Sequence, residues 1–182
     1  REYCFSFPVI TDEHINEIIK FETVIPLAKK AIPPGGQFEV EIKDDDFHGF
    51  IDYLVPVGKG LKLDGLIDGT DLEEFEAFDI YDFKYSNNVS GYKQSGQLHL
   101  YKYFFEKNNP GKKIRNMYFV FIPKVTIRQK KTETLLDFRQ RLKAELSGVE
   151  VKTVQVEFNI EKVIEFLFGI KAVNEETEFP QE

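Results

Sequence analysis

The spacing of hydrophobic residues along the chain predicts an alternation of helices and strands. Apolar residues recur at helical spacing from Thr11-Asp12 to the breaker at Pro33, and segment 37–43 then alternates apolar and polar positions as a strand does. Further runs predict strands at 47–57, 75–85, 114–125 and 149–158, and helices at about 90–107, 133–146 and 159–173. The order helix, three strands, helix, strand, helix, strand, helix indicates an α/β fold with a central mixed β-sheet flanked by helices.

Turn and capping residues set the expected boundaries of these elements. Segment 58–74 contains four glycines and many acidic residues, which predicts a long, mobile hairpin connection. Ser90 or Ser95 is expected to cap the helix that reaches Lys107, and Asn159 is expected to cap the last helix. The acidic tail 174–182 is expected to be flexible. The 182 residues hold no internal repeat, so we expect one domain over 1–182, which a longer parent protein could contain.

Cysteine usage and hydropathy exclude several classes of protein. The single cysteine, Cys4, excludes a disulfide or a four-cysteine iron–sulfur cluster within this chain, and it fits a reducing, cytoplasmic setting. No residues of a thiol enzyme accompany Cys4 in the sequence. No apolar run approaches the length of a membrane span, and no signal-peptide pattern opens the chain, so we expect no membrane partner.

Charge is distributed unevenly, although the net charge is −7. Residues 102–143 hold 12 Lys and Arg against 3 Asp and Glu, whereas the flanking segments are acidic. Such a basic block could track the phosphates of DNA, or it could be a solvated helix face with a basic loop. Its basic residues are Lys102, Lys107, Lys112, Lys113, Arg115, Lys124, Arg128, Lys130, Lys131, Arg139, Arg141 and Lys143.

Two acidic residues and a lysine interrupt the apolar strands 47–57 and 75–85. Asp82 and Lys84 are two apart and share one face of their strand, and Asp52 can lie opposite them if the two strands pair as a hairpin. Carboxylates, with the carbonyl of Phe83, are the oxygen ligands that Mg²⁺ or Mn²⁺ prefers, and such a metal assists phosphodiester hydrolysis. Lys84 could orient the attacking water or stabilise charge on phosphorus. The alternative is that these are exposed strand residues with a surface ion pair.

Gln97 and Tyr101 form a second candidate pair on the helix that follows. They are four residues apart and therefore share a helix face. A glutamine amide can donate to phosphate and accept from water, and a tyrosine can stack or form a hydrogen bond. Taken alone, such a pair more often belongs to a helix surface or to the edge of a core than to a functional site.

The series of motifs resembles a known nuclease family. Gly49-Phe50-Ile51-Asp52, then Tyr81-Asp82-Phe83-Lys84, then Gln97-Leu98-His99-Leu100-Tyr101 is similar to the G-x-x-D, (D/E)-x-K and Q-x-x-x-Y motifs of RecB-like exonucleases in the PD-(D/E)XK superfamily. The resemblance covers residues 37–107 directly. It implies a restriction-endonuclease-like core and a metal-dependent deoxyribonuclease that hydrolyses phosphodiester bonds.

The resemblance also implies roles for the residues that match. Asp52 and Asp82 would bind Mg²⁺ or Mn²⁺ and act in catalysis with Lys84, and Gln97 and Tyr101 would support the DNA substrate. The implied activity is exonucleolytic, on DNA ends or single strands in recombination or repair, of phage or prophage type, with a recombination protein as a further partner. The alternative is a catalytically incomplete nucleic-acid-binding module that keeps the nuclease fold.

The upstream acid or histidine that completes such sites is not assigned by the sequence. The candidates are His14, Glu17, Glu22, Glu39, Glu41 or a residue upstream of Arg1. We expect a structural or rim position for His48 and a surface position for His99. Gly58-Lys59-Gly60 lacks the spacing of a phosphate-binding loop.

Overall fold

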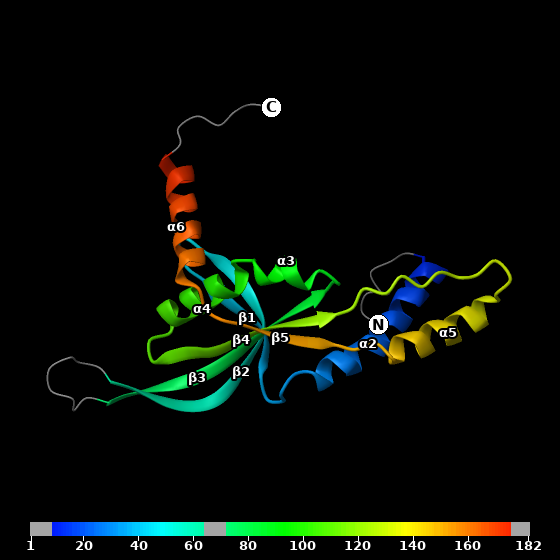
Figure 1. Ribbon diagram of the computed structural model, residues 1–182, viewed down its shortest axis with the longest axis horizontal. Coiled ribbons are helices and arrows are strands. Elements are labelled where there is room, and N and C mark those ends of the chain that lie inside the picture. Colours follow the sequence, from blue (N-terminus) through cyan, green and yellow to red (C-terminus); the bar gives the residue numbers. More distant parts are fainter. Residues whose placement is uncertain (1–8, 64–71, 176–182) are drawn as a thin grey trace. The chain divides into compact units, whose positions relative to one another are not determined.

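The computed structural model describes residues 9–63 and 72–175, and it has an α/β architecture with a five-stranded mixed sheet flanked by helices (Figure 1). Its elements are α2 (Asp12–Lys30), β1 (Gln37–Lys43), β2 (His48–Leu63), β3 (Leu72–Tyr85), α3 (Val89–Lys93), α4 (Gln97–Asn108), β4 (Lys112–Ile122), α5 (Leu135–Ser147), β5 (Lys152–Val156) and α6 (Ile160–Glu175). The predicted α/β class and central mixed sheet are confirmed. No described helix combines the length and the apolar character that a membrane crossing needs.

The sheet has the strand order β1-β2-β3-β4-β5. β1, β2 and β3 form an antiparallel meander. Two hydrogen bonds show how β3 lies beside β4. The backbone N–H of Glu76 donates to the carbonyl of Gly111 at 2.8 Å, and that of Ser86 donates to the carbonyl of Ile122 at 3.1 Å, so both strands run in the same direction. This is the pattern of a parallel pair, and it makes the sheet mixed.

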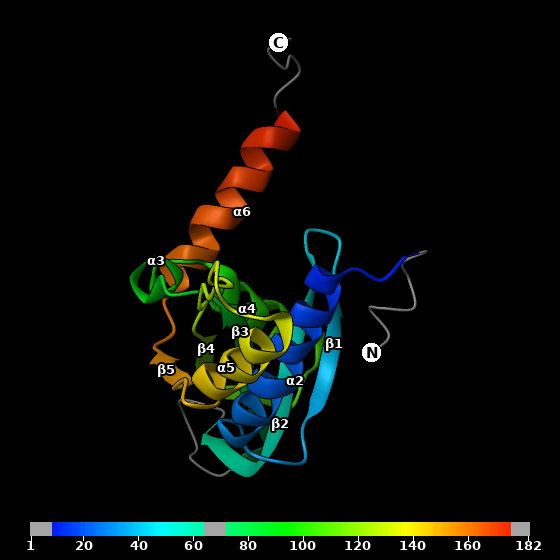
Figure 2. The same ribbon diagram turned by 90° about the vertical axis from the view of Figure 1, so that its right-hand side faces the viewer.

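The chain divides into two compact units. Unit 1 comprises Arg1–Pro33, Lys84–Asn87 and Val120–Thr153. In unit 1, α2 and α5 lie side by side (Figure 2), and they bury a cluster formed by Val24, Phe138, Leu142 and Leu146. Helical spacing of apolar residues on α5 creates this buried face.

Unit 2 comprises Pro34–Phe83, Asn88–Phe119 and Val154–Glu182. Its core includes Ile51, Ile80, Leu98 and Phe104, which are all at most 1% exposed. α4 also packs on α6. Asp52, Asp82, Gln97 and Tyr101 belong to this unit. Lys84, near the end of β3, belongs to unit 1.

Several predicted boundaries are wrong, and local backbone hydrogen bonding explains the differences. The hairpin connection expected at 58–74 is shorter, because β2 continues through Leu63 and β3 begins at Leu72; residues 64–71 lie outside the described part. A β-bulge between Pro56 and Gly58 lets the pairing continue where the sequence reads as a breaker. The expected strands 114–125 and 149–158 end earlier, at Ile122 and Val156.

The helix expected at about 90–107 is two helices. Asn88, rather than a serine, caps α3, and its side chain accepts from Gly91 N–H at 3.0 Å. α4 follows after a break at residues 94–96. The helix start expected at Thr11-Asp12 is confirmed, since Thr11 caps α2, and the cap expected at Asn159 is confirmed, since its side chain accepts from Glu161 N–H at 2.8 Å. Cys4 and tail residues 176–182 lie outside the described part, whereas 174–175 belong to α6.

Candidate functional site

β2 and β3 bring Asp52 and Asp82 to the same end of their pairing. The antiparallel pairing of the two strands reaches Tyr53 and Tyr81, and Asp52 and Asp82 are the residues directly beyond this last pair. The backbone N–H of Phe83 donates to Asp52 Oδ2 at 2.7 Å, which fixes the Asp52 carboxylate against β3. Asp82 is 1% exposed, and Asp52 is half-buried. The two aspartates therefore lie in neighbouring places within unit 2.

This placement of like charges is costly for folding. Like charges directly opposite on paired strands repel, and burial of a carboxylate costs free energy. A carboxylate pair in a sheet centre is a feature that functional sites show and ordinary cores avoid. Asp52 and Asp82 are thus candidates for a chemical role, and their carboxylates are suitable ligands for a divalent cation.

A second buried aspartate, Asp79, shows what a structural carboxylate looks like on the same strand. Asp79 is 4% exposed and lies three residues before Asp82, on the opposite face of β3. Arg115 donates to it through Nε at 3.2 Å and Nη2 at 3.0 Å, and Asn116 donates through its backbone N–H at 3.1 Å and Nδ2 at 3.0 Å. Asp79 is therefore held by four protein donors and has an evident structural role.

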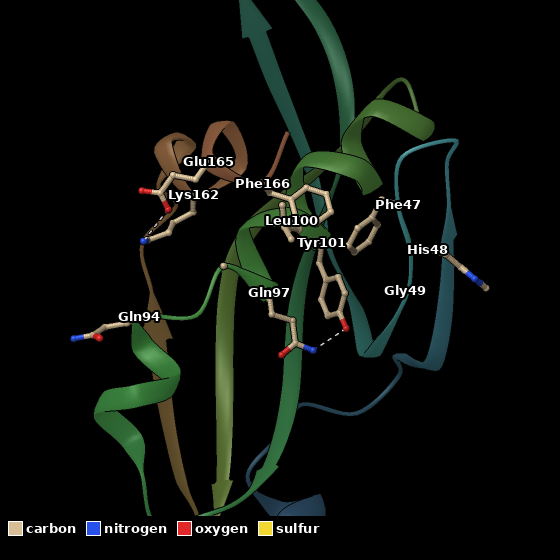
Figure 3. A pocket seen from close by; sticks show the side chains of 11 residues that line it. Phe47, His48, Gly49, Gln94, Gln97, Leu100, Tyr101, Lys162, Glu165 and Phe166 are labelled. Atoms are coloured by element: carbon tan, nitrogen blue, oxygen red, sulfur yellow. Dashed lines mark hydrogen bonds and ion pairs between the residues drawn. The ribbon is translucent and has the colours of Figure 1, made fainter. Parts of the chain in front are cut away.

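Gln97 and Tyr101 form a hydrogen-bonded pair on α4. Gln97 Nε2 donates to Tyr101 Oη at 2.8 Å, as the spacing of four residues allows (Figure 3). The pKa of Tyr101 is raised above its usual value, chiefly by burial, while the hydrogen bond from Gln97 opposes this rise and the charges of Asp82 and Asp52 add to it. Tyr101 thus lies within electrostatic reach of both aspartates.

Gly49, the glycine of the G-x-x-D motif, has a steric reason to be a glycine. A Cβ atom at this position would lie 3.1 Å from Tyr101 Cε1 and 3.1 Å from the ring of Phe47. These distances are shorter than nearly all real Cβ contacts. Gly49 therefore allows α4 to bring Tyr101 close to the start of β2.

A pocket of about 670 Å³ opens beside Tyr101 (Figure 3). Aromatic rings meet at this place, since the ring centroid of Phe47 lies 6.1 Å from that of Tyr101 and 6.0 Å from that of Phe166. The candidate residues Gln97 and Tyr101 line the pocket, whereas Asp52 and Asp82 do not. Its lining is Phe47, His48, Gly49, Gln94, Gly96, Gln97, Leu100, Tyr101, Lys162, Glu165 and Phe166.

Sequence reasoning missed the contribution of α6 to this pocket. Lys162 and Glu165 form an ion pair at 3.1 Å there, beside Phe166. The helical spacing of apolar residues predicted α6 itself. A helix period does not tell which other element the helix will cover, so no signal in the sequence placed these residues near Tyr101.

The two histidines near the motifs differ in burial. His48 is exposed, lines the rim of the pocket and lies 2.9 Å from Glu41 between Nε2 and Oε1. His99 is 3% exposed, so the expected surface position is wrong. The ring of Phe158 covers it at 5.9 Å, and its Nδ1 accepts from Asn159 N–H at 3.2 Å. Burial, with the charge of Lys162, lowers the pKa of His99 below its usual value.

Three candidates for a third metal ligand, His14, Glu17 and Glu41, have other partners. His14 Nδ1 accepts from Thr11 N–H at 3.2 Å at the start of α2, and Glu17 pairs with Lys20 at 2.6 Å. Glu41 pairs with His48. Within residues 9–63 and 72–175, no group of three or more His, Cys, Asp or Glu is placed to hold a metal ion. The carboxylate donors at hand are thus Asp52 and Asp82, a set that suits Mg²⁺ with water and substrate phosphate as further ligands.

Lys84 stands two residues beyond Asp82 on β3 and is half-buried. Because side chains at i and i+2 of a strand share a face, β3 directs Lys84 and Asp82 to the same side.

Comparison of the chain with protein-family models, with curated proteins and with solved structures finds no match.

Proposed function

We propose that this chain is a divalent-metal-dependent deoxyribonuclease with a restriction-endonuclease-like core of the RecB-like type. The observation that carries the proposal is the closeness of Asp52 and Asp82, directly beyond the last pair of β2 and β3, because neighbouring carboxylates are the oxygen ligands that a divalent cation prefers. The hydrogen-bonded Gln97 and Tyr101 pair beside it supports the same proposal.

Oxygen donors on neighbouring strands fit Mg²⁺ or Mn²⁺, and Asp52 and Asp82 would hold the ion. When bound, such a metal polarises a phosphoryl oxygen and lowers the pKa of its water. The Phe83 N–H keeps the Asp52 carboxylate oriented. Lys84, on the same face of β3, supplies positive charge for the phosphate in the transition state.

The pair on α4 would position DNA. The Gln97 amide donates to Tyr101 Oη through Nε2, and a glutamine amide has the donor and acceptor groups that bind phosphate or water. The neighbouring pocket has an aromatic lining and offers space for a nucleotide beside Gln97 and Tyr101. We propose exonucleolytic action on DNA ends or single strands, in recombination or repair.

The test is cleavage of end-labelled DNA with Mg²⁺ or Mn²⁺. Asp82→Asn and Lys84→Ala should each lower the rate by about 100-fold or more, because each removes a charge that acts in the transition state. Asp79→Asn is the matched control, since it changes another buried aspartate of β3 that is held by Arg115 and Asn116. Full activity in folded Asp82→Asn and Lys84→Ala proteins would refute the proposal.

The second candidate is a nucleic-acid-binding module with an incomplete metal site. It is favoured by the lack, in the described part of the chain, of a third acid or histidine grouped with the aspartates. Titration with Mn²⁺, followed by electron paramagnetic resonance, separates the two candidates. DNA binding without uptake of Mn²⁺ and without cleavage would favour the binding module.

A further inference from the structure

The segment that joins β4 to α5 in unit 1, residues 123–132, carries a concentrated positive charge. It contains Lys124, Arg128, Lys130 and Lys131, and it has no acidic residue. All four basic side chains are exposed. We call residues 123–132 the basic segment; Figure 1 shows it as a long chain without helical turns between β4 and α5.

The basic segment has an inner and an outer side. Val125 and Ile127 are half-buried and pack on the cluster of α2 and α5 that contains Leu142, whereas Lys124 and Arg128 are exposed. In an extended chain, alternate side chains point the same way and are about 6.6 Å apart. The apolar inner side therefore fixes the segment on unit 1 and leaves its charges in a row on the outer side.

Arg141 of α5 anchors the end of the basic segment. It donates to both oxygens of Glu133, through Nε at 2.7 Å and Nη2 at 2.8 Å, and Nη2 also donates to the carbonyl of Arg128 at 3.0 Å. The Glu133 carboxylate accepts the Lys130 N–H at 3.0 Å as well. The nearest acid in the sequence is thus committed to Arg141, and the hydrogen bond from Arg141 lowers the pKa of Glu133 to about 2.

Most other residues of the basic block form ion pairs with acids that the structure describes, although Lys112 and Lys143 do not. Lys107, Arg115 and Arg139 pair with Asp44, Asp79 and Asp12, and Lys102, Lys113 and Arg141 likewise pair with glutamates. By contrast, no ion pair joins Lys124, Arg128, Lys130 or Lys131 to any residue that the structure describes. Their charge is available to an external anion.

We propose that the basic segment binds the phosphate backbone of single-stranded DNA. A row of charges on a fixed extended chain suits a polyanion with regularly spaced phosphates. Thr126, which lies between Lys124 and Arg128 on the outer side, is polar, so this side lacks the apolar anchors of a protein or membrane site. The choice of DNA rests on the proposed nuclease function.

The test measures fluorescence anisotropy of a labelled oligothymidylate of about 20 nucleotides in EDTA, so that neither metal nor cleavage enters. The variant K124Q/R128Q/K130Q should bind about 100-fold more weakly at about 0.1 M salt, and its salt slope should fall by about 2, because single strands lose about 0.7 per phosphate contact. The control K29Q/K30Q/K143Q removes the same number of exposed charges from the helices of the same unit. The variant K124R/R128K/K130R should bind like the wild type.

Each outcome decides the proposal. A loss of about 100-fold in the affinity of K124Q/R128Q/K130Q for the oligonucleotide, with little loss of affinity in the control, supports the proposal. Equal losses in both would show a general charge effect and overturn it. Failure of the wild type to bind the oligonucleotide, or retention on phosphatidylserine vesicles instead, would also overturn it. These results do not decide nuclease activity, because cleavage by Asp82 and Lys84 variants is measured separately.

Discussion

Asp79 and Asp82 offer a direct test of whether the Asp82 carboxylate serves function rather than stability. Both are buried on β3, at 4% and 1% exposure, but on opposite faces of the strand. Asp79 accepts four hydrogen bonds from Arg115 and Asn116, whereas Asp82 lies close to Asp52 of β2, directly beyond the last pair of the two strands. The perturbation is the replacement of each aspartate by asparagine, which removes the charge and keeps the shape.

The structure predicts that Asp79→Asn lowers the free energy of unfolding and that Asp82→Asn does not. Asp79→Asn weakens charge-assisted hydrogen bonds. Because Arg115 is exposed, solvent screens part of this interaction, so the loss of folding free energy is about 2 kcal/mol. Asp82→Asn removes a like charge opposite Asp52 and the burial of a carboxylate. It should therefore leave stability unchanged or raise it by up to about 1 kcal/mol.

Thermal unfolding followed by circular dichroism at neutral pH, without added metal, measures both effects. For a chain of this size 1 kcal/mol corresponds to about 2–4 °C, so Asp79→Asn should lower Tm by about 4–8 °C and Asp82→Asn should not lower it. With Mg²⁺ or Mn²⁺ added, the wild type should gain stability and Asp82→Asn should gain less, since ligand binding to the folded state raises Tm. If Asp82→Asn lowers Tm as much as Asp79→Asn, the reasoning is refuted.

The remaining predictions concern the core and the helices around the site. His99 has a lowered pKa, so the folded state disfavours its protonation; stability should be full above about pH 6.5 and decline as the pH falls, and urea titrations of His99→Gln should show a weaker decline. Gly49→Ala should cost about 1–3 kcal/mol, measured by Tm, because its Cβ would press on the ring of Tyr101. Leu142→Ala should cost about 2–5 kcal/mol in urea unfolding, because Leu142 is 0% exposed between α2 and α5.

Each of these predictions has a result that contradicts it. An identical pH dependence in His99→Gln would show that other groups set the acid limit. An unchanged Tm in Gly49→Ala would mean that the rings move aside at no cost. A loss below 1 kcal/mol in Leu142→Ala would show that the helices repack, and Leu136→Ala, at a residue 66% exposed on the same helix, is the control.

The local pattern of the sequence was enough for the elements and for part of the site. Helical and alternating periods located α2, β1, α5 and α6 closely, because these periods depend on which side of each element is buried. The spacing of two residues put Asp82 and Lys84 on one strand face, and the spacing of four made Gln97 and Tyr101 a pair, which the 2.8 Å hydrogen bond confirms. These relations are set by neighbours along the chain.

The tertiary structure determined the contacts that the hydrophobic periodicity of the sequence does not specify. The register of β2 against β3 paired Tyr53 with Tyr81 and so brought the adjacent residues Asp52 and Asp82 together, which a different register would not have done. Folding also buried His99 under Phe158, brought α6 to the pocket beside Tyr101, and set Val125 and Ile127 inward so that the basic segment faces solvent. A periodic pattern specifies that a side is apolar, but the element that covers it depends on packing between segments far apart in the chain.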